Sequence, residues 1–77
     1  MSMREIVVNR ITELCEERNL SLNSLARAAG LPQSTVKNII YGASKNPGVV
    51  TIQKICDGLG INIVEFFDTP EFKSLAE

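Results

Sequence analysis

The chain has 77 residues, of which 44% are hydrophobic and 22% are charged, and its formal net charge is −1. This length accommodates one small domain, and the composition excludes a disordered or collagen-like chain. No apolar run is long enough to span a membrane or serve as a secretory signal, and two cysteines cannot build a disulfide framework. Histidine, the commonest general base and a usual metal ligand, is absent. We therefore expect a cytoplasmic protein that is not an enzyme and needs no cofactor, metal or small-molecule ligand.

The first predicted helix begins at a capping-box pattern, in which Ser2 is followed three residues later by Glu5. Apolar residues then repeat at helical spacing as far as the region of Asn19. The predicted buried stripe is Met3, Ile6, Val7, Ile11, Leu14 and Cys15. Because Cys15 and Cys56 both fall on apolar stripes, we interpret them as small core residues rather than redox partners.

Two shorter helices are predicted next. Ser21 is placed to cap the second helix, and Gly30 is placed to end it with a left-handed residue. Its apolar positions are Leu22, Leu25, Ala26 and Ala29. Pro32 precedes a third helix over residues 33–41, and Gly42 ends that helix. Val36, Ile39 and Ile40 should be buried, which leaves a polar opposite face.

The C-terminal part predicts two helices and a short sixth. A fourth helix is expected over 49–58, with a buried stripe of Ile52, Ile55, Cys56 and Leu59. Asn62 and Glu65 resemble a second capping box, which would open a fifth helix with Ile63, Val64 and Phe67 available for the core. Thr69 and Pro70 suggest a frayed sixth helix over the last eight residues. The predicted fold is thus all-α, with a domain over 1–68 and a C-terminal segment over 69–77.

The charges are divided along the chain. Between Glu17 and Asp57 there is no acidic residue, and this stretch carries five cations: Arg18, Arg27, Lys37, Lys45 and Lys54. The rest of the chain holds all nine acids against three cations. We interpret the acid-free stretch as a surface that faces an anion.

The most informative segment is a helix-turn-helix unit over residues 21–41, where two short helices are joined by a glycine-containing turn. The outer face of its second helix carries Gln33, Ser34, Lys37, Asn38 and Tyr41. Amide, hydroxyl and ammonium groups complement base edges and phosphates, and Gln and Asn can bind adenine through two hydrogen bonds. The small side chain of Ala26 suits a close crossing of the two helices.

In this order and spacing the sequence resembles the phage repressor/Cro-like, or XRE-like, helix-turn-helix family. The resemblance is carried by Leu25-Ala26, Ala29-Gly30, Gln33-Ser34-Thr35-Val36, Tyr41-Gly42, Asn46-Pro47 and Leu59-Gly60-Ile61. It implies a compact five-helix, lambda-repressor-like fold whose third helix lies in the major groove.

The resemblance also implies roles for single residues. Base contacts would come from Gln33, Ser34, Lys37 and Asn38. Phosphate contacts would come from Thr35, Tyr41, Ser44, Lys45 and Asn46, although Tyr41 could also simply complete the helix. Many relatives have a phosphate-binding Gln where this chain has Leu22, so that Ser21 or Asn23 would have to replace it.

Two functions are compatible with these features. The acid-free stretch favours a sequence-specific regulator of transcription, of repressor type, that binds double-stranded DNA. The low net charge and Leu22 favour a protein-interaction module of the same fold, such as an antirepressor or an antitoxin-like partner. A module this small covers only a few base pairs, so we also expect a weak homodimer. The predicted contact surface is Ile63, Phe66, Phe72 and Leu75.

Overall fold

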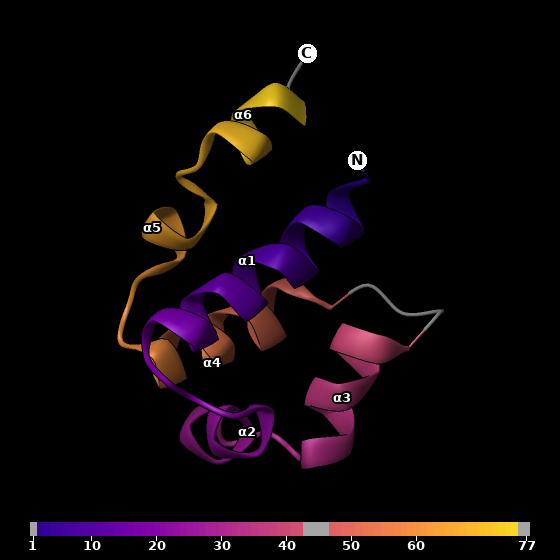
Figure 1. Cartoon of the computed structure of the whole chain (residues 1–77), viewed down its shortest axis with the longest axis vertical. Coiled ribbons are helices and arrows are strands. Elements are labelled where there is room, and N and C mark those ends of the chain that lie inside the picture. Colours follow the sequence, from indigo (N-terminus) through magenta and orange to yellow (C-terminus); the bar gives the residue numbers. More distant parts are fainter. Residues whose placement is uncertain (1, 43–46, 76–77) are drawn as a thin grey trace.

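A computed structural model describes residues 2–42 and 47–75, and in these two ranges the chain forms six helices and no strand (Figure 1). The helices are α1 (Met3–Glu17), α2 (Leu22–Ala29), α3 (Gln33–Tyr41), α4 (Val49–Leu59), α5 (Ile63–Phe67) and α6 (Pro70–Leu75). The predicted all-α class is therefore confirmed, and the short sixth helix is formed. Within the two described ranges, no helix has the length and apolar composition needed to cross a membrane.

The predicted helix ends are set by local hydrogen bonds. The backbone amide of Glu5 donates to Ser2 Oγ at 3.2 Å, and the Ser2 amide donates to Glu5 Oε1 at 2.9 Å, which completes the capping box. The hydrogen bond from the Ser2 backbone amide is the main cause that lowers the pKa of the Glu5 carboxyl, and the Ser2 side chain lowers it further. α2 and α4 end at Gly30 and Gly60, whose φ angles are 68° and 74°. Such left-handed residues are the ordinary glycine stop of a helix.

The core draws on the first five helices. Its buried members are Val7, Ile11, Leu14, Cys15, Leu25, Ala26, Val36, Ile39, Ile52, Ile55, Cys56, Leu59, Ile61 and Phe66. Both cysteines are buried and burial raises the pKa of both thiols, as befits small core residues. Met3 and Ile40 were expected in the core, but Met3 is 49% exposed and Ile40 is only half-buried. Met3 lies on the first turn of α1, at the rim of a hollow that it shares with Pro47.

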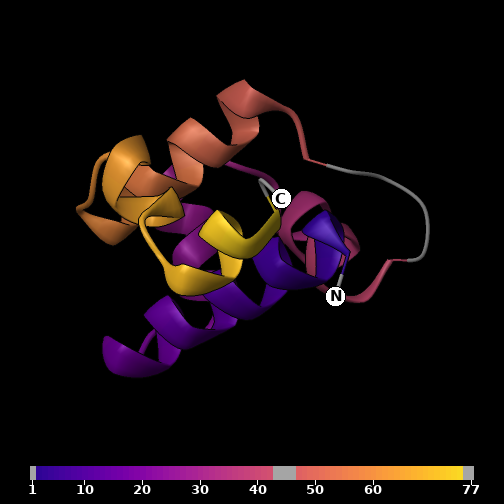
Figure 2. The ribbon, with the colours of Figure 1, turned by 90° about the horizontal axis from the view of Figure 1, so that it is seen from above.

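The register of α5 corrects the expectation from the sequence. Phe66, which was expected on the surface for dimerisation, has no exposed area, whereas Val64, which was expected in the core, is 73% exposed. The ring of Phe66 lies 4.9 Å from that of Phe67, and Phe67 lies 4.8 Å from Phe72. Figure 2 shows α6, which carries Phe72, alongside α1. Because this aromatic cluster closes one end of the core, Phe66 is not available to a partner.

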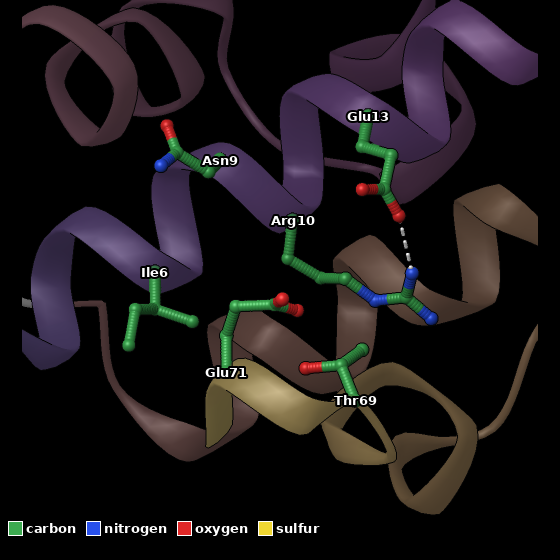
Figure 3. A pocket seen from close by; sticks show the side chains of 6 residues that line it. All are labelled: Ile6, Asn9, Arg10, Glu13, Thr69 and Glu71. Atoms are coloured by element: carbon green, nitrogen blue, oxygen red, sulfur yellow. Dashed lines mark hydrogen bonds and ion pairs between the residues drawn. The ribbon is translucent and has the colours of Figure 1, made fainter. Parts of the chain in front are cut away.

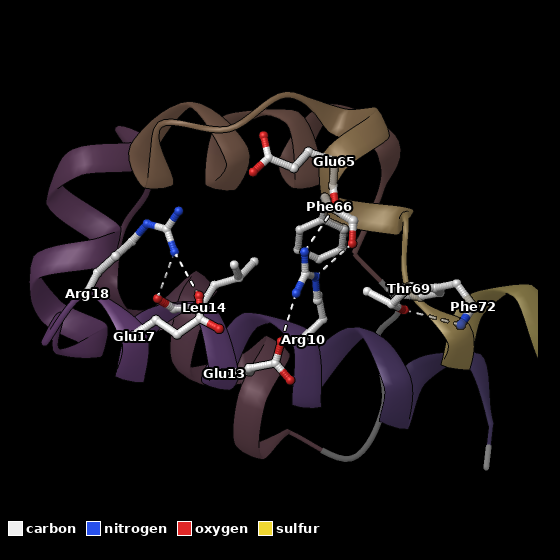
Figure 4. Close-up of polar contacts among 9 residues, drawn as sticks. All are labelled: Arg10, Glu13, Leu14, Glu17, Arg18, Glu65, Phe66, Thr69 and Phe72. Carbon is white, nitrogen blue, oxygen red and sulfur yellow. Dashed lines mark hydrogen bonds and ion pairs between the residues drawn. The ribbon is translucent and has the colours of Figure 1, made fainter.

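Arg10 on α1 and Arg18, the residue that directly follows α1, bind the ends of later helices, and Figure 4 shows the contacts of Arg10. Arg10 donates from Nε to the carbonyl of Phe66 at 2.9 Å and from Nη2 to that of Glu65 at 3.0 Å, while Nη1 pairs with Glu13 at 2.8 Å. Arg18 donates from Nε to the carbonyl of Leu59 at 3.0 Å. The last carbonyls of a helix lack intrahelical partners, so guanidinium groups stabilise them. Arg18 is thus occupied by a structural role within the acid-free stretch.

The backbones of α2 and α4 lie close together at Gly58. A Cβ atom at this position would lie 2.9 Å from the backbone nitrogen of Ala29. Overpacking of this kind costs about 1–3 kcal/mol, while alanine gains about 1 kcal/mol over glycine inside a helix. We expect Gly58→Ala to lower the free energy of unfolding by roughly 1 kcal/mol in urea titrations. The control is Asp57→Ala on the exposed side of the same turn, which should change it by less than about 0.5 kcal/mol.

Candidate nucleic-acid interface

The turn between α2 and α3 is built by Gly30 and Pro32. After the left-handed Gly30, the amide of Leu31 donates back to the carbonyl of Ala26 at 2.9 Å, which closes the end of α2. Pro32 is extended, with φ −60° and ψ 144°, and redirects the chain into α3. Figure 1 looks nearly along α2 while α3 lies across the view, so the two helices cross steeply. This geometry places α3 at the edge of the molecule.

α3 has one buried and one open face. Val36 and Ile39 are 1% and 6% exposed and attach the helix to the core. The open face consists of Gln33, Ser34, Lys37, Asn38 and Tyr41, all exposed. Thr35 is half-buried beside this face. The structure thus brings the four predicted base-contacting residues and Tyr41 together on one surface that contains no acidic side chain.

The predicted phosphate contacts at the start of α2 differ in availability. Ser21 Oγ accepts from the Ser24 amide at 3.1 Å and donates to Ser24 Oγ at 3.0 Å, so its single proton is already used. For Ser21 to donate a hydrogen bond to a phosphate, its hydroxyl would therefore have to give up the hydrogen bond to Ser24 Oγ. Asn23 is exposed on the first turn, whereas Leu22 packs against the core. Ser44, Lys45 and Asn46 lie outside the described residues.

The start of α4 presents backbone amides in place of a side-chain cap. Gly48 precedes the helix, and no described side chain caps it by a hydrogen bond. Val49 and Val50 follow and are 73% and 65% exposed. The free amides of a first helical turn attract anions. The signal in the sequence was the glycine at a position where Ser, Thr, Asp or Asn would be the usual cap.

The charges of the described residues are divided between elements. Arg27 on α2, Lys37 on α3 and Lys54 on α4 are exposed. Seven of the described acids lie instead on α1, α5 and α6 or in the link between the last two: Glu5, Glu13, Glu16, Glu17, Glu65, Asp68 and Glu71. An anionic ligand is therefore favoured at the α2–α3 side and disfavoured at the other.

A family model for the Cro/C1-type HTH DNA-binding domain matches residues 10–71. The chain belongs to this family. This Cro/C1-type domain is also similar to a solved structure titled "Crystal structure of the prophage Lp1 protein 11". The two share 42% sequence identity over 92% of this chain and 93% of that chain, with a TM-score of 0.82. No curated protein matches. The resemblance to phage repressors and Cro proteins is therefore confirmed.

A second hollow in the Cro/C1-type domain has a different chemistry. It measures about 250 Å³ and lies between α1 and α6 (Figure 3). Its lining residues are Ile6, Asn9, Arg10, Glu13, Thr69 and Glu71. Arg10 is its one lining cation and is already paired with Glu13 at 2.8 Å. The described lining of this hollow therefore offers no unpaired positive charge to a phosphate group.

Proposed function

We propose that this chain is a sequence-specific regulator of transcription, of repressor type, which reads the major groove of double-stranded DNA with α3. The observation that carries the proposal is the open face of α3. Every side chain on it bears an amide, hydroxyl or ammonium group, and none is acidic. Membership of a DNA-binding domain family supports the same function. Repression would follow from occupation of an operator.

The proposed contacts divide into two groups. Gln33, Ser34, Lys37 and Asn38 would meet base edges, with the two amides best suited to adenine. Asn23, Tyr41 and the free amides at the start of α4 would meet phosphates and set the register of the domain. Contacts from Thr35, Ser21, Ser44, Lys45 and Asn46 stay predictions.

Selection from a pool of random duplexes tests the function. At low salt we expect the chain to retain duplex DNA and successive rounds to enrich one short motif. Retention without enrichment would contradict sequence-specific reading. The absence of any retained duplex would favour the second candidate, a protein-interaction module of antirepressor or antitoxin-like kind, which the net charge of −1 supports.

Lys37 provides a test of the electrostatic contribution. Lys37→Gln should reduce the slope of log binding constant against log salt by roughly one counterion if the ammonium group reaches a phosphate. If it reaches a guanine instead, the loss should be confined to the selected motif. Fluorescence anisotropy measures the salt dependence of binding for wild type and for Lys37→Gln, on the selected motif and on an unrelated duplex. The control is Lys73→Gln, since Lys73 pairs with Asp68 at 3.1 Å on α6, and it should leave the slope unchanged.

We propose further that two copies bind a two-fold symmetric site, with α3 of each copy roughly 34 Å apart. Because Phe66 is buried, the proposed contact surface shifts to the apolar residues around α5. Val64 is 73% exposed and, with Ile63, Phe67 and Asp68, lines an open groove of about 500 Å³. Phe72 is half-buried and Leu75 is 40% exposed, so the C-terminal segment extends this surface.

Val64→Glu is expected to abolish self-association, because two carboxylates would be desolvated at a symmetric contact. Sedimentation equilibrium with and without a palindromic duplex measures the effect. Met3→Glu changes an apolar residue of 49% exposure on α1 and should leave association intact. Should Val64→Glu associate like wild type while Leu75→Glu does not, the contact lies in the C-terminal segment instead.

A further inference from the structure

One arginine of α1, Arg4, contacts the C-terminal end of α3, the helix proposed to read DNA. Arg4 lies on the first turn of α1 and donates from Nη2 to the backbone carbonyl of Gly42, which directly follows α3. The same nitrogen lies 3.4 Å from the carbonyl oxygen of Ile39. Among the described residues, no partner accepts from the buried Nε of Arg4. The hydrogen bonds of this guanidinium are thus made to the C-terminal end of α3.

Among the described residues, this end of α3 has few other attachments. The buried residues of the helix are Val36 and Ile39, whereas Ile40 is half-buried and Tyr41 is 76% exposed. Helix contacts of α3 are made mainly with α2, near its N-terminal end. The Gly42 amide donates to the Asn38 carbonyl at 2.9 Å, but the last carbonyls of a helix have no intrahelical partner. Arg4 supplies one from outside the helix.

We propose that Arg4 is a positioning residue for DNA reading. It fixes the last turn of α3 and so holds Lys37, Asn38 and Tyr41 at the depth and angle that their contacts require. The inference rests on the proposed function and assigns to α1 a part in it. Arg10 and Arg18 bind the ends of α5 and α4 in the same way, but neither of those helices carries the proposed reading face.

Arg18 therefore offers a matched control. Arg4→Met on α1 and Arg18→Met directly after it each remove one guanidinium while keeping an apolar stem of similar length. Arg4→Lys keeps the charge but shortens the side chain, so that its ammonium group stops short of the position from which Nη2 reaches the two carbonyls. The first measurement is amide hydrogen exchange of the whole chain by NMR, corrected for global stability. The second is affinity for the selected motif and for a scrambled duplex, at a temperature where each variant is fully folded.

In Arg4→Met we expect the amides of residues 40–42 to exchange at least tenfold faster, with α1 and α2 unchanged. Its affinity for the selected motif should fall about tenfold and its affinity for the scrambled duplex much less. The ratio of the two affinities should therefore become smaller. Arg18→Met should show neither change. Arg4→Lys should keep only part of the exchange protection of residues 40–42 and only part of the affinity for the selected motif.

Three results would overturn the proposal. Equal effects of Arg4→Met and Arg18→Met would make the role one of general stability. A loss that is uniform over sequences and fully recovered by Arg4→Lys would make Arg4 a phosphate contact. Unchanged exchange at residues 40–42 would show that Arg4 does not hold the helix end. If wild type binds no duplex, the DNA-reading role fails together with the proposed function, and hydrogen exchange alone decides whether Arg4 orders α3.

Discussion

Phe66→Ala is expected to lower the free energy of unfolding by about 3–5 kcal/mol, the cost of a large cavity in a core that cannot collapse to fill it. Phe66 has no exposed area, and its ring lies 4.9 Å from Phe67 and 6.1 Å from Phe72. Its carbonyl also accepts the hydrogen bond from Arg10 at 2.9 Å, so the loss of packing would loosen the attachment of α5 to α1. The total free energy of unfolding of a domain of this size is roughly 4–12 kcal/mol, so the substitution would remove a considerable part of it.

Urea denaturation followed by circular dichroism measures this loss. Val64→Ala is the control on the same helix, because Val64 is 73% exposed and its truncation should cost less than about 0.5 kcal/mol. A larger loss from Val64→Ala than from Phe66→Ala would mean that α5 has the opposite register.

Gln33→Ala is expected to weaken binding to the selected motif by about 1–3 kcal/mol and to relax the preference at one base pair. Gln33 is exposed on the first turn of α3, where its amide can form two hydrogen bonds to one adenine. Truncation leaves the base edge without its partners, while the phosphate contacts of the domain persist. The change should therefore be large for the motif and small for unrelated duplexes.

Anisotropy titrations with the motif and with each of its single-base variants measure both effects. Gln53→Ala is the matched control, since Gln53 is an exposed glutamine on α4 beside Ile61 and Ile63, outside α3. If Gln33→Ala leaves affinity and base preference unchanged, Gln33 does not read a base. If both glutamine variants weaken binding equally, the effect is not local to α3.

The helix boundaries could be predicted because they depend on neighbours in the chain. The box at Ser2 and Glu5, the cap at Ser21 and the left-handed Gly30 and Gly60 each act within four residues. α3 spans Gln33–Tyr41, as expected. Its open face could be predicted for the same reason, since a helix of nine residues with two buried positions leaves its other side to solvent.

The prediction failed where the spacing of apolar residues held too little information. α5 has five residues, four of them apolar, so its pattern does not distinguish one face from another. Phe66 rather than Val64 is buried because α5 packs against α4 and the shared core, and because the ring of Phe72 on α6 lies 6.1 Å from that of Phe66. For this reason the surface proposed for dimerisation includes Val64 and no longer includes Phe66.

The sequence by itself determined the all-α class, the helix ends and the polar face of α3, because these follow from hydrogen bonds and periodicities between near neighbours. Only the tertiary structure decided the roles of Arg4, Arg18 and Gly58. Arg4 and Arg18 meet carbonyls 38 and 41 residues further along the chain, and Gly58 is required by the backbone of α2. A charged residue on a helix and a glycine within one have no local pattern that reveals such partners, since the partners exist only once the helices pack.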